Sequence, residues 1–212
     1  FYDFSAHCPT AHRPLDDHED PSPPEHLTPP RQASPDDQYW SFQEREVDRG
    51  PGRLVSLYTN LTWDTAVIGR DVAFTDIQDW VVAAVEAFAA RPAHRLVIRV
   101  HPSEVALPGK VTRDSLAAFI HDRYPVLPPN VTVVEPTDLT SSYPLMDASD
   151  LGLVYTSTTG LELALAGTPV IVAGETHYRG KGFTTDVSSP EEFTAALDAA
   201  LGDPAVLPVD VE

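Results

Sequence analysis

Several absences bound what this chain of 212 residues can be. Its single cysteine, Cys8, excludes a disulfide framework within the chain and agrees with a reducing compartment. No stretch approaches the roughly 18 apolar residues that a membrane-spanning helix needs. No secretion signal or initiator methionine is present, so we expect Phe1 to lie inside a longer protein. We expect this longer protein to be cytoplasmic, or peripheral at the inner face of the membrane.

Positive charge is also scarce. Lys and Arg total 14 against 32 Asp and Glu, which gives a net charge of −18, and Lys110 and Lys181 are the only lysines. Nucleic-acid-binding domains need a basic face, so this balance disfavours a nucleic-acid partner. Two explanations fit the preference for Arg over Lys in so acidic a chain: adaptation to a high-salt cytoplasm, or the codon bias of a GC-rich genome.

The first 52 residues differ in composition from the rest. They are rich in Pro, Asp, Glu and His, and their apolar residues show no sustained period. Such a composition cannot bury enough apolar surface to order a chain. We therefore expect a Pro-rich, acidic linker or peripheral segment over residues 1–52 and one folded domain over residues 53–212.

From Arg53 onward, apolar runs that predict strands alternate with segments whose apolar residues have helical spacing. This alternation favours the α/β class, with a Rossmann-like parallel sheet and helices on both faces. The expected strands are Leu54–Tyr58, Arg95–Val100, Val131–Val134, Leu151–Tyr155 and Val170–Ala173. The expected helices are Asp76–Ala90, Thr112–Arg123, Ser141–Ala148, Leu161–Ala166 and one that begins at a Ser189–Glu192 capping box.

The segment Leu151–Thr176 carries the clearest functional signal. Its first strand ends at small polar residues, and a helix follows directly. Open α/β sheets bind phosphorylated ligands at such turns, because amides at the start of a helix and nearby hydroxyls donate hydrogen bonds to an anion. The residues expected to bind a phosphate here are Ser157, Thr158, Thr159 and Gly160.

A second polar turn follows another expected strand. The strand Arg95–Val100 runs directly into His101 and Pro102. The proline restricts the backbone, which would place the imidazole well to meet a phosphate. Because parallel strands place their carboxyl ends at one edge of the sheet, we expect His101 near Ser157. The alternative is a surface histidine in a turn.

Several motifs together resemble one protein family. They are Thr59–Asp64, Phe74–Asp76 with Asp79-Trp80, Ile98–Glu104, and Thr156–Glu162 followed by Gly167–Val170. In this order they resemble the nucleotide-sugar half of bacterial capsule polysaccharide synthesis proteins, which are Kdo-transferase-like glycosyltransferases of the GT-B type. The resemblance covers the chain from Leu54 to Thr185.

The resemblance implies a donor site. Sialyltransferases and polyol-phosphate transferases, which use CMP- or CDP-activated donors, share the His-Pro and Ser-Thr pair. The pair therefore implies a cytidine-nucleotide donor, here expected to be a CMP-activated sugar, Kdo-like or sialic acid-like. It implies that His101 contacts the donor phosphate and that Ser157 and Thr158 hydrogen-bond to it. Glu162 would reach the ribose hydroxyls or the base. The alternative for Glu162 is a capping box with Thr159.

Further candidates flank these turns. Asn60 and Asp64 follow the first strand, where the cleft of a GT-B enzyme would lie. A polar loop rich in glycine follows the last expected strand, and its cations would face a phosphate or a sugar carboxylate, with a solvated loop as the alternative. The cations of this loop are His177, Arg179 and Lys181.

The resemblance covers only half of a GT-B enzyme, because such enzymes have two Rossmann-like domains and this chain has strands for one. We therefore expect an acceptor domain upstream of Phe1, a glycan or glycolipid acceptor, and no catalytic base that can be named here. The fragment alone would bind donor without transferring it. No DxD-like metal motif is evident, so neither a metal nor a cofactor is expected. The alternatives are a nucleotide-sugar epimerase of the same architecture and a non-catalytic binding module.

Asn60 and Asn130 also begin N-x-T sequons. Because no secretion signal precedes them, we interpret both as chance matches rather than glycosylation sites.

Overall fold

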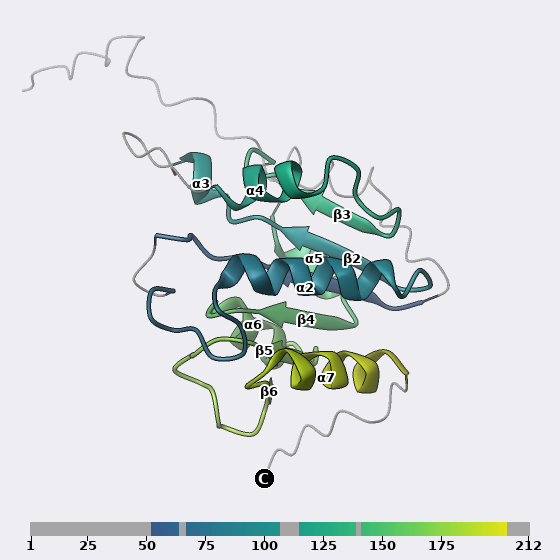
Figure 1. Ribbon diagram of the computed structural model, residues 1–212. Coiled ribbons are helices and arrows are strands. Elements are labelled where there is room, and N and C mark those ends of the chain that lie inside the picture. Colours follow the sequence, from purple (N-terminus) through teal and green to yellow (C-terminus); the bar gives the residue numbers. More distant parts are fainter. Residues whose placement is uncertain (1–51, 64–66, 107–114, 139–140, 203–212) are drawn as a thin grey trace, which may run out of the picture. The chain divides into compact units, whose positions relative to one another are not determined.

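A computed structural model describes residues 52–63, 67–106, 115–138 and 141–202, and its centre is a parallel sheet. The strands have the order β3-β2-β1-β4-β5-β6, and every neighbouring pair is parallel. They are β1 (Leu54–Tyr58), β2 (Arg95–Arg99), β3 (Val131–Val134), β4 (Leu151–Val154), β5 (Val170–Val172) and β6 (Thr185–Asp186) (Figure 1). The expected Rossmann-like α/β class is confirmed.

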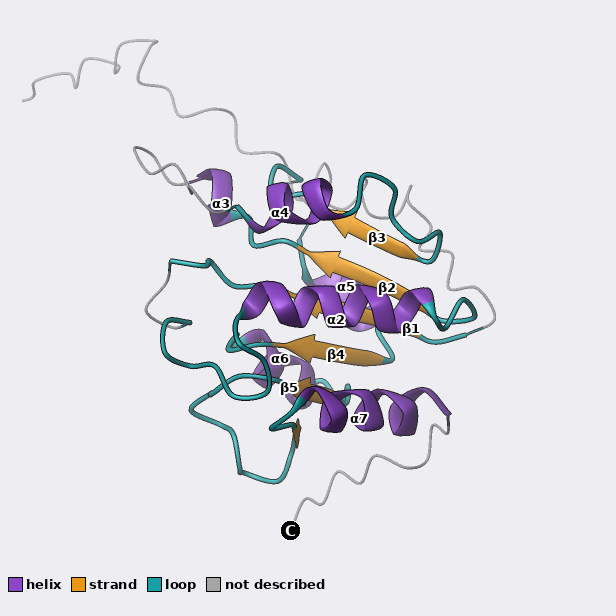
Figure 2. Ribbon diagram, viewed as in Figure 1, coloured by secondary structure: helices purple, strands orange, loops and turns teal. Residues whose placement is uncertain are grey.

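Helices cover both faces of this sheet, as Figure 2 shows. They are α2 (Ile77–Ala89), α3 (Ser103–Ala106), α4 (Leu116–Arg123), α5 (Tyr143–Ala148), α6 (Thr159–Leu165) and α7 (Pro190–Gly202). Residues that alternate along strands β1 to β5 belong to two separate hydrophobic cores, one under α2, α4 and α7 and the other under α5 and α6. In β1, for example, Val55 and Leu57 belong to the first core, and Leu54 and Tyr58 belong to the second.

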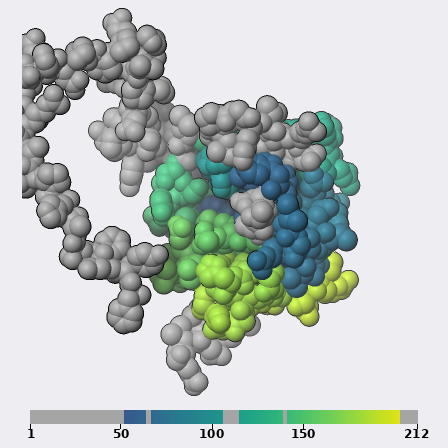
Figure 3. Space-filling model, turned by 90° about the vertical axis from the view of Figure 1, so that its left-hand side faces the viewer, coloured from purple at the N-terminus to yellow at the C-terminus, as the bar shows by residue number. Residues whose placement is uncertain are grey.

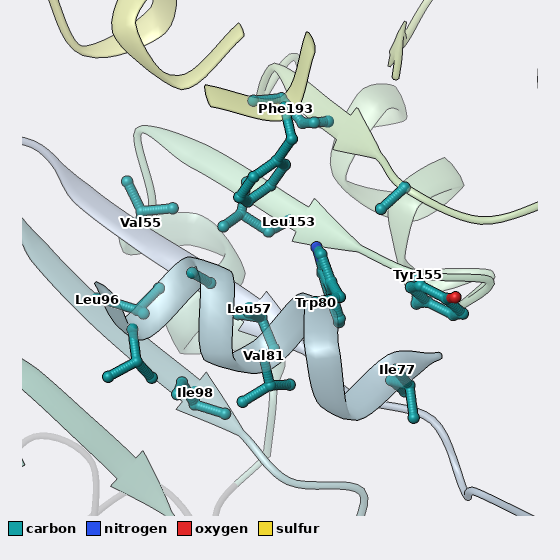
Figure 4. Packing of buried hydrophobic residues seen from close by; sticks show 14 of the residues in the cluster. Val55, Leu57, Ile77, Trp80, Val81, Leu96, Ile98, Leu153, Tyr155 and Phe193 are labelled. Carbon is teal, nitrogen blue, oxygen red and sulfur yellow. The ribbon is translucent and has the colours of Figure 1, made fainter. Parts of the chain in front are cut away.

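Helix α2 shows how the sequence sets one of these layers. Asp76 is its N-cap, and the Asp76 carboxylate accepts a hydrogen bond from Asp79 N–H at 2.8 Å. Its apolar residues recur at helical spacing and lie on the face that packs against the sheet, where Trp80 and Val81 are fully buried (Figure 4). The predicted helix Asp76–Ala90 is therefore correct to within one residue at each end.

Four elements differ from the sequence-based expectation. Strand β6, with two residues, and helix α3, with four, are too short to show a hydrophobic period. Helix α4 begins at Leu116, where the Ser115 hydroxyl accepts from Ala118 N–H. Helix α6 begins two residues earlier than predicted, at Thr159.

Candidate functional site

The carboxyl ends of the strands, at the arrowheads in Figure 1, form the edge that carries the predicted site residues. From β1 the chain proceeds to β2 and β3 on one side of β1, and then crosses to β4 on the other side. The switch point of the topology is therefore between β1 and β4. Ligands of open α/β sheets bind in the crevice at such a point.

Two side chains at the end of β1 link the neighbouring turns. The Thr59 hydroxyl accepts a hydrogen bond from His101 N–H, at 2.9 Å. The Asn60 carbonyl oxygen Oδ1 accepts one from Thr156 N–H, at 3.3 Å. Both side chains are at least nine-tenths buried. The structure thus brings the turn after β2 and the turn after β4 together around the end of β1, as predicted from the parallel topology.

The His101 ring is oriented by its own turn. Its Nδ1 accepts a hydrogen bond from Ser103 N–H at 3.1 Å, so in the neutral ring the proton is on Nε2. Glu104 anchors the next residues, because its buried carboxylate accepts from the Ser115 hydroxyl at 2.7 Å and from Leu116 N–H at 2.9 Å. Glu104 therefore caps α4. This cap fixes where the chain leaves the turn after β2, residues 100–102, which is called the His101 turn below.

The turn after β4, residues 156–160, is called the Ser157 turn below. The Ser157 hydroxyl accepts from Thr159 N–H at 3.2 Å and donates to the Thr159 hydroxyl at 2.9 Å. Thr158 is the N-cap of α6, is exposed, and its side chain makes no capping bond. The alternative reading of Glu162, a capping box with Thr159, is wrong, because Thr159 already lies inside the helix. Glu162 is exposed on α6, and its role toward a ribose stays a prediction.

Residues 173–184, here the Arg179 loop, connect β5 to β6 and carry the three predicted cations. The Arg179 guanidinium is occupied by the fold: it donates to the carbonyls of Val172, Gly174 and Val187 and to the Ser188 hydroxyl, at 2.8–3.4 Å. His177 and Lys181 are exposed. Of the three cations, these two remain available to a ligand.

The loop between β1 and α2 crosses the ends of β4 and β5. Glu175 N–H donates to the Arg70 carbonyl at 2.8 Å, and Ala73 N–H donates to the Ala173 carbonyl at 3.0 Å. Residue 174 must be glycine here, because a Cβ would lie 2.9 Å from the Thr156 methyl group. Figure 3 looks onto this edge, where the blue, green and yellow-green parts of the chain meet. Asp64, predicted for the cleft, is outside the described residues.

A buried phenol also holds this loop. The Tyr155 hydroxyl donates to the Asp71 carboxylate at 2.6 Å, and the ring packs at 5.4 Å from that of Trp80. Burial, the hydrogen bond to Asp71 and the negative charge of that carboxylate all raise the Tyr155 pKa, so the hydroxyl stays a donor.

Sequence reasoning missed three residues at this edge. Thr59 and Tyr178 act through contacts with residues 42 and 21 positions away, which no local pattern reveals. Arg70 is an exposed cation, and its side chain makes no hydrogen bond or ion pair to the residues that the structure describes. An arginine that follows a glycine in a strongly acidic chain was the available sequence signal for it.

The fold is that of a Rossmann-like domain with polar turns at its switch point, and comparison with known families shows where it belongs. The family described as capsule polysaccharide biosynthesis protein matches residues 50–202, well over half of the chain. The chain belongs to this family. Among curated proteins, none matches.

Two solved structures are among those similar to this chain. The beta Kdo 2,4 transferase KpsC of Thermosulfurimonas dismutans is 23% identical, covering 68% of this chain and 44% of that chain, with a TM-score of 0.48. The UDP-GlcNAc 2-epimerase of Neisseria meningitidis is 16% identical, covering 77% of this chain and 40% of that chain, with a TM-score of 0.51. This chain therefore spans less than half the length of either structure, and the epimerase likeness shows the fold alone.

Two absences concern the described residues only. None of their helices is both long and apolar enough to cross a membrane. Within the same residues, no three His, Cys, Asp or Glu side chains gather as a metal site would require.

Proposed function

We propose that this chain is the donor-binding half of a glycosyltransferase that acts in cell-surface polysaccharide synthesis. Its donor would be a CMP-activated sugar, Kdo-like or sialic acid-like, and its acceptor a glycan or glycolipid. An upstream domain would bring the acceptor and the catalytic base, and the enzyme would work in the cytoplasm or at the inner face of the membrane. Membership of the capsule polysaccharide biosynthesis family supports this reading.

One observation carries the proposal: the His101 turn and the Ser157 turn are both bonded to the end of β1. Thr59 and Asn60 supply those bonds, at 2.9 and 3.3 Å. A phosphate bound at this edge would meet an imidazole donor from one side and hydroxyl and amide donors from the other. Both sides are fixed before the ligand arrives, which limits the ordering cost of binding.

The proposed chemistry is transfer by attack of an acceptor hydroxyl on the anomeric carbon of the sugar. The nucleotide phosphate leaves with additional negative charge. Donors already oriented toward that charge lower the barrier, because they need not reorganise during the reaction. His101 Nε2–H and the Thr158 hydroxyl would serve this role, and the Ser157 hydroxyl would join them by turning its proton from Thr159 to the phosphate. His177 and Lys181 are the proposed contacts for an anionic group of the sugar.

Calorimetry with CMP tests the site. His101→Ala and Ser157→Ala should each weaken binding by about 1–3 kcal/mol, or roughly 5- to 150-fold, as expected for hydrogen bonds to a charged group. Matched controls are His121→Ala, which removes an exposed imidazole bonded to Glu135, and Ser189→Ala, which removes the capping serine of α7. Unchanged affinity in both site variants, or equal losses in the controls, would overturn the assignment.

The nucleotide and the activity are tested separately. CMP should bind more tightly than UMP; the reverse result would overturn the CMP assignment and favour a UDP-sugar enzyme such as an epimerase. The fragment should bind donor but give no acceptor-dependent release of nucleotide, because positioning both reactants supplies about 7–11 kcal/mol of barrier lowering. Turnover by this fragment equal to that of a longer chain would refute the half-enzyme proposal.

A further inference from the structure

Tyr178 is a buried phenol beside the Ser157 turn to which sequence reasoning gave no role. It is 3% exposed, and its hydroxyl donates to the Ser157 carbonyl oxygen at 2.5 Å. Its ring is stacked on that of Phe183 at 6.0 Å and meets the edge of the His177 ring at 5.1 Å. A tyrosine from the Arg179 loop is thus inserted under a turn that lies 21 positions earlier in the chain.

Gly160 makes this insertion possible. A Cβ at residue 160 would collide with the Tyr178 hydroxyl and would lie 2.9 Å from a methyl group of Val154. With glycine there, the first turn of α6 approaches the phenol closely. The Ser157 carbonyl then accepts two hydrogen bonds, from Tyr178 and, at 3.3 Å, from Gly160 N–H.

Hydrogen bonds of the neighbouring residues hold the Tyr178 side chain in place. The next residue, Arg179, donates to three carbonyls and a hydroxyl on both sides of the loop. Asp186 accepts from Gly180 N–H at 2.6 Å. Burial raises the pKa of Tyr178 to about 12, so its hydroxyl keeps its proton and donates at any working pH.

The planar peptide between Ser157 and Thr158 transmits this constraint to Thr158 N–H. Because the peptide unit is planar and trans, fixing the Ser157 oxygen also fixes the direction of Thr158 N–H, which points the opposite way. This N–H makes no hydrogen bond to the part of the chain that the structure describes. The Thr158 side chain makes no capping hydrogen bond to α6 either.

We infer that Tyr178 is a positioning residue for donor binding, which orients the Ser157–Thr158 peptide so that Thr158 N–H donates to the donor phosphate. This inference rests on the proposed function. It adds a residue that does not touch the donor and assigns Gly160 a steric role in place of contact with the phosphate.

The test compares two Tyr→Phe variants that each remove one short phenol hydrogen bond at this edge. Tyr178→Phe frees the Ser157 carbonyl, whereas Tyr155→Phe frees Asp71 in a different loop. Both should lower the melting temperature by a similar amount. Without ligand, only Tyr178→Phe should shift the ¹⁵N–¹H signal of Thr158, and only this variant should weaken CMP binding, by about five- to tenfold, the equivalent of one neutral hydrogen bond.

The outcomes separate this inference from the proposed function. An unshifted Thr158 signal in Tyr178→Phe overturns the inference whether or not CMP binds. Equal weakening of CMP binding by Tyr155→Phe also overturns it, since the effect would then be general loosening of the edge. If the wild-type chain binds no CMP, the proposed function fails, while a shifted Thr158 signal would still support the positioning contact.

Discussion

Arg179 offers the sharpest separation of a structural role from a ligand-binding one. Its Nη1 donates to the carbonyls of Val172 and Gly174, at 3.4 and 3.2 Å, and its Nη2 to the Val187 carbonyl and the Ser188 hydroxyl, at 2.8 and 3.0 Å. The guanidinium therefore joins the end of β5 to the segment after β6. Arg179→Met removes these bonds while keeping most of the apolar side chain.

The expected loss can be worked from these contacts. Hydrogen bonds from a charged donor contribute about 1.5–3 kcal/mol each, but the two longer ones here contribute little, and the group is partly solvated. We therefore expect Arg179→Met to cost about 3 kcal/mol. For a domain of this size, such a loss lowers the melting temperature by roughly 6–12 °C. Arg179→Lys should recover only part of it, because a single ammonium cannot match the planar fork.

The assay is thermal denaturation combined with CMP calorimetry well below the melting temperature. Lys181→Ala is the matched control, since Lys181 is an exposed cation of the same loop and should leave the melting temperature unchanged. If Arg179→Met melts like the wild type and yet loses CMP affinity, the guanidinium serves the donor rather than the fold, and the reasoning from its four acceptors is refuted.

Two other residues give predictions of stability. Asn130 Nδ2 donates to the carbonyls of Phe88, Arg91 and His94. Asn130→Ala should therefore lower the free energy of unfolding by about 2–3 kcal/mol in a urea titration, and Asn130→Asp should lower it more, because a carboxylate repels three carbonyls. An Asp variant as stable as the wild type would contradict this contact. Burial, then the charges of Arg53 and Arg91, lower the His94 pKa from its ordinary 6.5, and His94 Nδ1 accepts from Arg53 N–H. The unfolded chain therefore binds more protons than the folded one, and stability falls as the pH drops below 6.5. The melting temperature of His94→Asn should fall less steeply over this range. A fall as steep as that of the wild type would contradict this role of His94.

The strands were predictable because burial on both faces leaves continuous apolar runs. β1 and β3 have the predicted bounds, and β2, β4 and β5 each end one residue earlier than predicted. The placement of the turns that carry His101 and Ser157 at one edge of the sheet followed from topology alone, since parallel strands end at one edge. Those two predictions needed only local pattern and the direction of the strands.

Tertiary hydrogen bonds decided what could not be predicted. The charge of Arg179 suggested a ligand contact, but the carbonyls that it meets carry no sequence signal. The spacing of Thr159 and Glu162 suggested a capping box, yet α6 begins one residue too early for it. In both cases the residue type was informative, and the partner was set by chain segments that only the fold brings near.

Burial of the two N-x-T sequons has a practical consequence for producing this protein. Asn60 and Asn130 are 9% and 8% exposed, and the side-chain amide of each is part of a hydrogen bond inside the fold. A glycan attached to either nitrogen could not be accommodated once the domain has folded, but a secretory host would meet both sequons while the chain is still extended. Export through such a host would therefore yield glycosylated chains in which β1 and β3 cannot pack as they do here. Production in a compartment without N-glycosylation avoids this misfolding.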